Sequence, residues 1–356
     1  MLNNMFFNNL SQIKSLFSKI NDESEFEIMF YNYKQENKLS ITKFINVLYF
    51  MKYYSNLKKY KLVNTIGLDI SYNYAHTNVY RISINGINKI NKILNAVHQR
   101  KNHVIFSILT TQFYNDDDLT FINKIKDNKN IINYDDYDIR FRLSQEEELD
   151  KKILINLSNL QYTEADKITF RYKERLSMII FDNEKLGQIR LDLTIVKFSN
   201  SPDNLHYADK EFEIELEYSK GTEDISDKIL TQLLNEAKLV KQVLENSNEI
   251  ISKEEHNNVL KMYKKILLNS ENNLITNLYS MQPISAEVQH VVDKIPNRYA
   301  VTDKADGDKY QLFIFNNIIY LISNNLQLDT YFGTGLTSGQ DVLIGLGASF
   351  RFLKKN

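Results

Sequence analysis

The stretch Glu211–Lys220, EFEIELEYSK, alternates acidic and apolar side chains over its first eight residues. Successive side chains of a strand point to opposite faces, so Glu213, Glu215 and Glu217 share one face of a predicted strand at 209–218. Carboxylates this close repel one another and need water, a cationic side chain or a metal ion beside them. The stretch therefore predicts a strand with one apolar face and one face that attracts cations.

A second strand near the N-terminus repeats this pattern. In SEFEIMF, residues 24–30, Glu25 and Glu27 lie two positions apart and share a face. Oxygen ligands without histidine or cysteine favour Mg²⁺ or Mn²⁺. A solvated acidic face is the alternative for a single strand, and two such strands give the metal interpretation about equal weight.

Basic side chains follow the same period of two on the strands between these acidic ones. We predict strands near 78–85, 103–109, 137–143, 167–181 and 187–198. Their candidate phosphate-binding residues are Arg81, Arg140, Arg142, Arg171, Lys173, Arg175, Arg190 and Lys197. Inward-facing cations beside inward-facing glutamates suit a bound polyanion such as a triphosphate. Alternating surface charge on antiparallel strands is the simpler alternative.

Helical periodicity appears in several other segments between residues 1 and 269. It predicts helices within 1–20, 39–61 and 86–98, and two long polar helices within 223–269. A second strand-rich part begins near residue 298. The 356 residues suggest about two domains of mixed α+β class.

Composition narrows the class of protein. The net charge of −1 excludes a strongly basic nucleic-acid binder, and the absence of cysteine excludes disulfides and thiolate metal sites. No apolar run reaches the ~18 residues of a membrane helix, and the N-terminus lacks a signal peptide. We expect a cytoplasmic protein without a membrane partner.

The strands SEFEIMF, IRLDLTIVK (189–197) and EFEIELEYSK resemble the RNA triphosphatase domain of large DNA virus mRNA capping enzymes. That domain belongs to the triphosphate tunnel metalloenzymes. The resemblance implies an antiparallel eight-stranded β-tunnel with flanking helices and an Mg²⁺ or Mn²⁺ cofactor. It also implies that the metal and catalytic residues are Glu25, Glu27, Glu215 and Glu217, with Glu213 a weaker metal ligand.

The same resemblance assigns phosphate binding to the basic strand residues, foremost Arg81, Arg171, Lys173, Arg190 and Lys197. The family often carries a basic residue two positions after the second glutamate of the first strand. Here that position is Met29, so this phosphate contact is missing or comes from another strand.

A second resemblance lies in YAVTDKADGDKYQLFIF, residues 299–315. Lys304, Asp306 and Gly307 match the K-x-D-G signature of capping guanylyltransferases and ligases, in which the lysine attacks a nucleoside triphosphate such as GTP. Lys309, a further nucleotide-binding candidate, stands where an arginine is usual. Only 52 residues follow Lys304, too few for the later motifs, so we expect an incomplete guanylyltransferase domain.

The two resemblances together imply three parts and one activity. The parts are a triphosphatase tunnel at 1–222, a helical linker at 223–275, and a partial nucleotidyltransferase domain at 276–356. The predicted activity is metal-dependent removal of the γ-phosphate from 5′-triphosphate RNA during mRNA capping. Nucleoside triphosphates are further ligands, and a methyltransferase domain or subunit is a possible partner.

Three other functions stay open at this point. The first is another tunnel enzyme, such as a tripolyphosphatase or a nucleotide cyclase. The second is a guanylyltransferase or ligase acting through Lys304. The third is a non-catalytic scaffold that only binds RNA or a partner.

Overall fold

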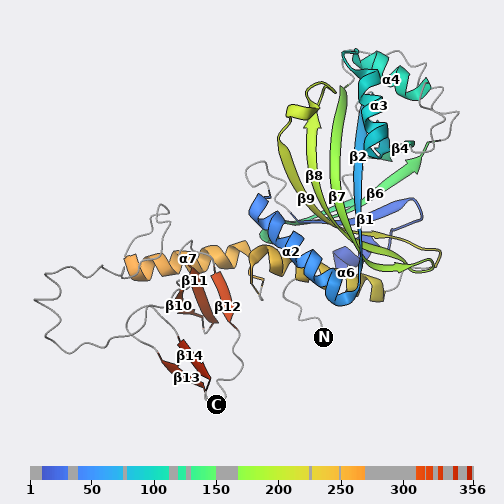
Figure 1. Cartoon of the computed structure of the whole chain (residues 1–356). Coiled ribbons are helices and arrows are strands. Elements are labelled where there is room, and N and C mark those ends of the chain that lie inside the picture. Colours follow the sequence, from blue (N-terminus) through green and yellow to red (C-terminus); the bar gives the residue numbers. More distant parts are fainter. Residues whose placement is uncertain are drawn as a thin grey trace, which may run out of the picture. The chain divides into compact units, whose positions relative to one another are not determined.

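The computed structural model divides the chain into two compact units, Met1–Asn246 and Ser247–Asn356 (Figure 1). The residues that it describes are 10–30, 39–74, 78–111, 119–125, 130–149, 167–223, 227–247, 250–268, 310–316, 318–323, 328–331, 340–343 and 351–354. The division falls later than the predicted boundary at residue 222, because the first of the two long helices packs within the first unit.

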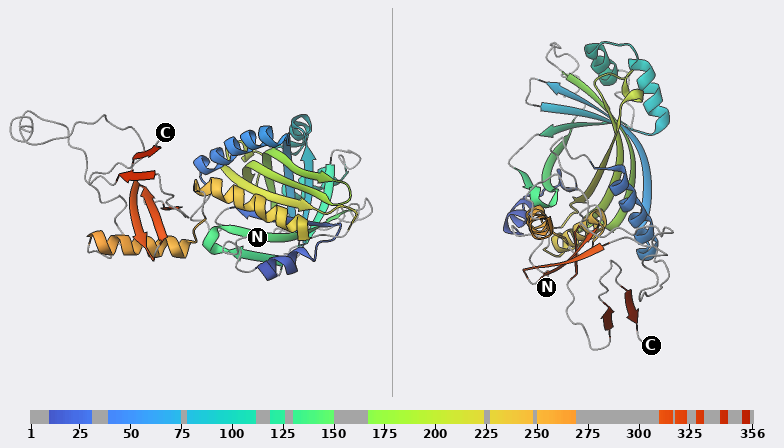
Figure 2. Two further views of the ribbon diagram at one scale, coloured as in Figure 1. Left: turned by 90° about the horizontal axis from the view of Figure 1, so that it is seen from below. Right: turned by 90° about the vertical axis from the view of Figure 1, so that its left-hand side faces the viewer.

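Nine antiparallel strands form the sheet of the first unit. They are β1 (Ser24–Phe30), β2 (Lys61–Tyr74), β3 (Asn78–Asn85), β4 (Leu119–Ile125), β5 (Ile131–Tyr134), β6 (Ile139–Glu148), β7 (Lys167–Asn183), β8 (Gly187–Ser199) and β9 (Lys210–Ser219). The order β1-β9-β8-β7-β2-β3-β4-β6 closes on itself, because β6 also pairs with β1. The predicted eight-stranded antiparallel tunnel is confirmed (Figure 2). The short β5 pairs with β6 on the same edge as β4, at residues 139–142.

Helices cover the outside of this barrel. They are α1 (Leu10–Phe17), α2 (Ile41–Lys58), α3 (Ile87–Val97), α4 (Asn102–Thr111) and α6 (Asp227–Glu245), with short 3₁₀ turns η2 (Asp135–Tyr137) and η3 (Leu205–Tyr207). The predicted helices at 39–61 and 86–98 are confirmed. Ser40 caps α2 by accepting a hydrogen bond from the Lys43 amide. No helix in the described part of the chain is long and apolar enough to span a membrane.

The strand predicted at 103–109 is wrong, since these residues belong to α4. Ile105 and Leu109 are both fully buried and lie four residues apart, which places them on one face of a helix. They pack in one cluster with Ile90 and Ile93 of α3. A short apolar run reads equally well as strand or helix, and only its packing partners decide.

The hydrophobic core lies between the outer faces of the strands and these helices. Leu68 of β2, Ile84 of β3 and Phe170 of β7 are all fully buried in the cluster under α3 and α4. On the other side, Phe44 of α2 lies 4.9 Å from Phe212 of β9, ring centroid to centroid. Because the apolar face of each strand points outward, its polar face points into the barrel.

The described residues of the second unit include a small antiparallel sheet and the helix α7. The sheet is formed by β10 (Tyr310–Phe315), β11 (Ile318–Ser323) and β12 (Leu328–Tyr331); the helix is α7 (Lys253–Leu268), and a separate hairpin joins β13 (Gln340–Leu343) to β14 (Arg351–Lys354). Tyr263 of α7 and Tyr320 of β11 share a buried cluster. The second strand-rich part is thus present, while Lys304, Asp306, Gly307 and Lys309 lie outside the described residues.

The hairpin that joins β7 to β8 depends on a glycine. Gly187 has φ +98°, and an added Cβ would overlap the Ser219 carbonyl oxygen and lie 2.9 Å from the Gly221 nitrogen. Gly86 has a similar φ of +92° but open space around it. We expect Gly86→Ala to cost about 1–3 kcal/mol of stability through backbone strain alone, and Gly187→Ala to cost clearly more. Urea unfolding of both variants measures the difference, and equal losses would contradict the steric argument.

Candidate functional site

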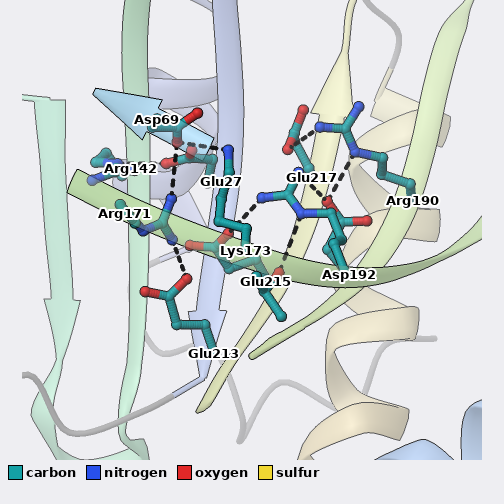
Figure 3. Close-up of polar contacts among 12 residues, drawn as sticks. Glu27, Asp69, Arg142, Arg171, Lys173, Arg190, Asp192, Glu213, Glu215 and Glu217 are labelled. Carbon is teal, nitrogen blue, oxygen red and sulfur yellow. Dashed lines mark hydrogen bonds and ion pairs between the residues drawn. The ribbon is translucent and has the colours of Figure 1, made fainter. Parts of the chain in front are cut away.

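The register of the strands decides which side chains meet inside the barrel. Glu27 of β1 is the cross-strand partner of Glu217 on β9, and Glu217 is in turn the partner of Arg190 on β8. Directly paired residues have Cβ atoms about 4.5–5.5 Å apart. Glu27, Glu217 and Arg190 are therefore neighbours across three adjacent strands on the inner face (Figure 3).

One half of the site is organised around Asp192, which is fully buried. Its Oδ2 lies 3.0 Å from both Arg175 Nη1 and Arg190 Nε. Arg190 also donates to Glu217 Oε2 at 2.7 Å, and Arg175 Nη2 lies 3.9 Å from Glu215 Oε2. Two arginines and three carboxylates thus form one connected network across β7, β8 and β9.

The other half is organised around Asp69 of β2, whose side chain is 2% exposed. It pairs with Lys173 at 2.6 Å and Arg171 at 3.4 Å, and it accepts a hydrogen bond from Ser83 at 2.9 Å. Burial opposes ionisation of Asp69, but Lys173 and other cations outweigh it and hold the pKa of this carboxyl below its usual value. Arg171 also pairs with Glu213.

Two further ion pairs complete the inner face. Arg142 of β6 pairs with Glu27, which is 6% exposed, and Arg81 of β3 pairs with Glu146 of β6. Glu25 lies on the same face of β1 as Glu27 and repels Glu217 electrostatically. Carboxylates and cations therefore both line the inner face, and the glutamates of β1 and β9 lie next to each other there.

Two glutamates of β9, Glu215 and Glu217, have raised pKa values in this environment. Burial and the neighbouring Glu27 and Glu213 raise the pKa of Glu215 to about 7. Burial and Glu25 raise the pKa of Glu217 well above its usual value, against the opposing effect of Arg190. Crowded buried carboxylates of this kind are stabilised in their charged form when a cation binds between them.

Two carboxylate oxygens fit such a cation. Glu217 Oε1 and Asp192 Oδ1 are buried and have no hydrogen-bond partner within the described residues. An all-oxygen donor set suits a hard divalent ion. No three acidic or histidine side chains of the described residues converge on one point. Arg190 occupies the other oxygen of Glu217 and of Asp192, and Arg142 pairs with the neighbouring Glu27. The donor set fits a metal whose binding displaces part of these ion pairs.

The barrel brings most of the predicted site residues together. Those in the charged cluster of Figure 3 are Glu27, Arg142, Arg171, Lys173, Arg190, Glu213, Glu215 and Glu217. Arg175 joins them through its ion pairs, and Glu25 and Arg81 share the same inner face. Arg140 lies opposite Met29 and donates to Asn133 of β5 at 2.8 Å.

The expectation that Lys197 faces inward with Arg190 is wrong. Lys197 lies five positions after Asp192, and an odd difference in position places a side chain on the opposite face of a strand. Its Nζ instead donates to the His206 carbonyl on η3 at 2.7 Å. Asp69 and Asp192 were not predicted from the sequence as site residues. Each lies between buried apolar residues along its strand, and this alternation could have identified both.

The sequence of this chain is similar to that of a known viral protein. No family model matches the chain. The chain is 31% identical over 306 residues to a "Probable mRNA-capping enzyme" of Acanthamoeba polyphaga mimivirus, which covers 86% of this chain and 24% of that protein. The chain thus spans about a quarter of the length of this relative.

Solved structures agree with the barrel. The RNA triphosphatase domain of a trifunctional mimivirus mRNA capping enzyme superposes with a TM-score of 0.50 at 25% identity, covering 67% of this chain and 95% of that one. A monoclinic form of the mimivirus capping enzyme triphosphatase gives a TM-score of 0.51 at 23% identity, covering 66% and 97%. The first unit therefore has the fold of a triphosphate tunnel.

Proposed function

We propose that this chain, a relative of a mimivirus mRNA-capping enzyme with the tunnel fold of its triphosphatase domain, removes the γ-phosphate from 5′-triphosphate RNA. The products are diphosphate-ended RNA and inorganic phosphate. The observation that carries this proposal is the closed barrel whose inner face pairs buried carboxylates with Arg171, Lys173, Arg175 and Arg190.

These cations are positioned to grip a triphosphate. Arginine presents a planar fork that matches phosphate oxygens, while lysine acts as a point charge. Arg171, Lys173 and Arg175 lie at alternate positions of β7 and therefore form a row along the tunnel. Each is already oriented by an ion pair with a carboxylate, so little reorganisation is needed when phosphate oxygens take the place of that partner.

Mg²⁺ or Mn²⁺ is the cofactor that this site would take. Glu25, Glu27, Glu215 and Glu217 would hold it, with Asp192 adjoining. A divalent ion there would offset the negative charge that develops on the phosphoryl oxygens. Arg190 and Arg175 fix the orientation of Glu217 and Asp192.

The proposal is tested by phosphate release from γ-labelled triphosphate RNA with Mg²⁺, with Mn²⁺ and with EDTA. We expect release with either metal and a fall to background with EDTA, because the crowded carboxylates need a divalent cation. The melting temperature should also rise when metal is added, since the metal binds only the folded site. Release that persists in EDTA would contradict a metal-dependent tunnel.

The place of this reaction in capping is a further part of the proposal. The matched relative is a capping enzyme, and K-x-D-G lies downstream of the tunnel in this chain. A covalent adduct of labelled GTP that disappears in Lys304→Ala would assign guanylyl transfer to the second unit. The absence of an adduct would leave the chain as a triphosphatase alone.

A further inference from the structure

The inner face of β8 ends in an aromatic side chain. Phe198 is 46% exposed. It lies at an even separation from Asp192 and Thr194, so it shares their inward face. The pairing of β7 with β8 continues to this point, where Phe198 is the direct partner of Arg171. A half-exposed ring thus stands beside the last cation of the inner row.

Three cross-strand pairs of β7 and β8 line the inner face between Asp192 and Phe198. Arg175 stands opposite Thr194, Lys173 opposite Val196, and Arg171 opposite Phe198. From Asp192 to Phe198 the strand advances six residues, about 20 Å. The path therefore leads from the buried carboxylates, past three cations, to one aromatic ring.

A 5′-triphosphate bound along this path has a definite direction. With its γ-phosphate at Glu217 and Asp192, its other phosphates lie along the cations of β7. The first nucleoside then reaches the end of β8, where Phe198 presents its ring. Exposed aromatic rings beside basic side chains are the usual platform for unpaired bases, and stacking accepts every base because each has a π-face.

We propose that Phe198 stacks on the first nucleoside of the substrate and makes the tunnel prefer triphosphates that carry a nucleoside over inorganic tripolyphosphate. This inference rests on the proposed triphosphatase function and names the part of the substrate that the end of β8 recognises. Phe198 binds substrate and takes no part in the bond that breaks.

Hydrogen bonds hold this end of the strand in place. Ser199 Oγ accepts from the Ser201 amide at 3.0 Å and donates to the Ser201 carbonyl at 2.7 Å. Asp203 in the same turn pairs with His98 and accepts from the Gln99 amide at 3.4 Å, both at the end of α3. A strand end held in place before binding reduces the entropy lost when a base stacks on the ring that it carries.

The test compares a substrate that has a nucleoside with one that has none. KM for triphosphate RNA and the inhibition constant of tripolyphosphate against that reaction are measured for Phe198→Ala, Phe198→Leu and Phe198→Tyr. We expect KM for RNA to rise about tenfold in the Ala and Leu variants, with the tripolyphosphate constant unchanged. Phe198→Tyr should retain the wild-type KM because it retains an aromatic face.

Tyr207 supplies the matched control. It is 83% exposed on η3, next to the carbonyl that binds Lys197 on the outer face. Tyr207→Ala should leave both constants unchanged. Equal changes in the RNA and tripolyphosphate constants of Phe198→Ala, or no change in either, would overturn the stacking assignment.

A binding measurement separates this inference from the proposed activity. The Kd of RNA with a 5′-triphosphate and a 3′-fluorescent label is measured by anisotropy for wild type and Phe198→Ala. A weaker Kd in the variant supports stacking even if no phosphate is released, which would defeat only the proposed hydrolysis. An unchanged Kd defeats the inference while leaving hydrolysis to stand on its own assay.

Discussion

Glu217→Gln is expected to lower kcat for phosphate release from triphosphate RNA by at least about 100-fold, a loss of the size seen when one fixed electrostatic group leaves an active site. Glu217 is 4% exposed, and its Oε1 has no hydrogen-bond partner within the described residues. The amide keeps the shape of the side chain but removes the negative charge that a divalent ion needs. Single-turnover assays at saturating Mg²⁺ measure the loss.

The fold of this variant should survive. Glu217 is repelled by Glu25 and Glu27, so removing its charge relieves repulsion, while Arg190 keeps Asp192 as a partner. We expect a melting temperature in EDTA equal to or above that of the wild type. A kcat within threefold of the wild-type value, from protein that melts normally, would remove Glu217 from the catalytic site.

Asp192→Ala is expected to lower the free energy of unfolding by about 3–5 kcal/mol, the usual cost of breaking a buried ion pair by removing one of its members. Asp192 is fully buried and neutralises both Arg175 and Arg190, whose side chains are 20% and 26% exposed. Without it, two arginines on neighbouring strands repel each other inside the barrel. Urea unfolding followed by circular dichroism measures the loss.

An exposed ion pair provides the control for this comparison. Lys14 and Asp227 lie 2.8 Å apart, but their side chains are 46% and 80% exposed. Asp227→Ala should cost less than about 1 kcal/mol, because water and salt screen exposed charges. If Asp192→Ala were as mild as Asp227→Ala, the inner network would not be holding β7, β8 and β9 together.

The sequence alone determined the local alternation and the chemistry that it offers. EFEIELEYSK shows which side chains of β9 share a face, because strand geometry has a period of two whatever surrounds it. The same argument found Glu25, Glu27 and the cations of β7, and the resemblance to capping triphosphatases supplied the closed tunnel. Helices at 39–61 and 86–98 were readable from their spacing for the same local reason.

Tertiary structure decided which faces meet and what each short apolar run becomes. Residues 103–109 became α4 because Ile105 and Leu109 find partners on α3. Lys197 turned outward although it follows the inward residues of β8 closely. Asp69 reached Arg171 and Lys173 through a pairing of strands about one hundred residues apart in the chain. Register across such distances is set by closure of the barrel and packing of its helices, which no local pattern encodes.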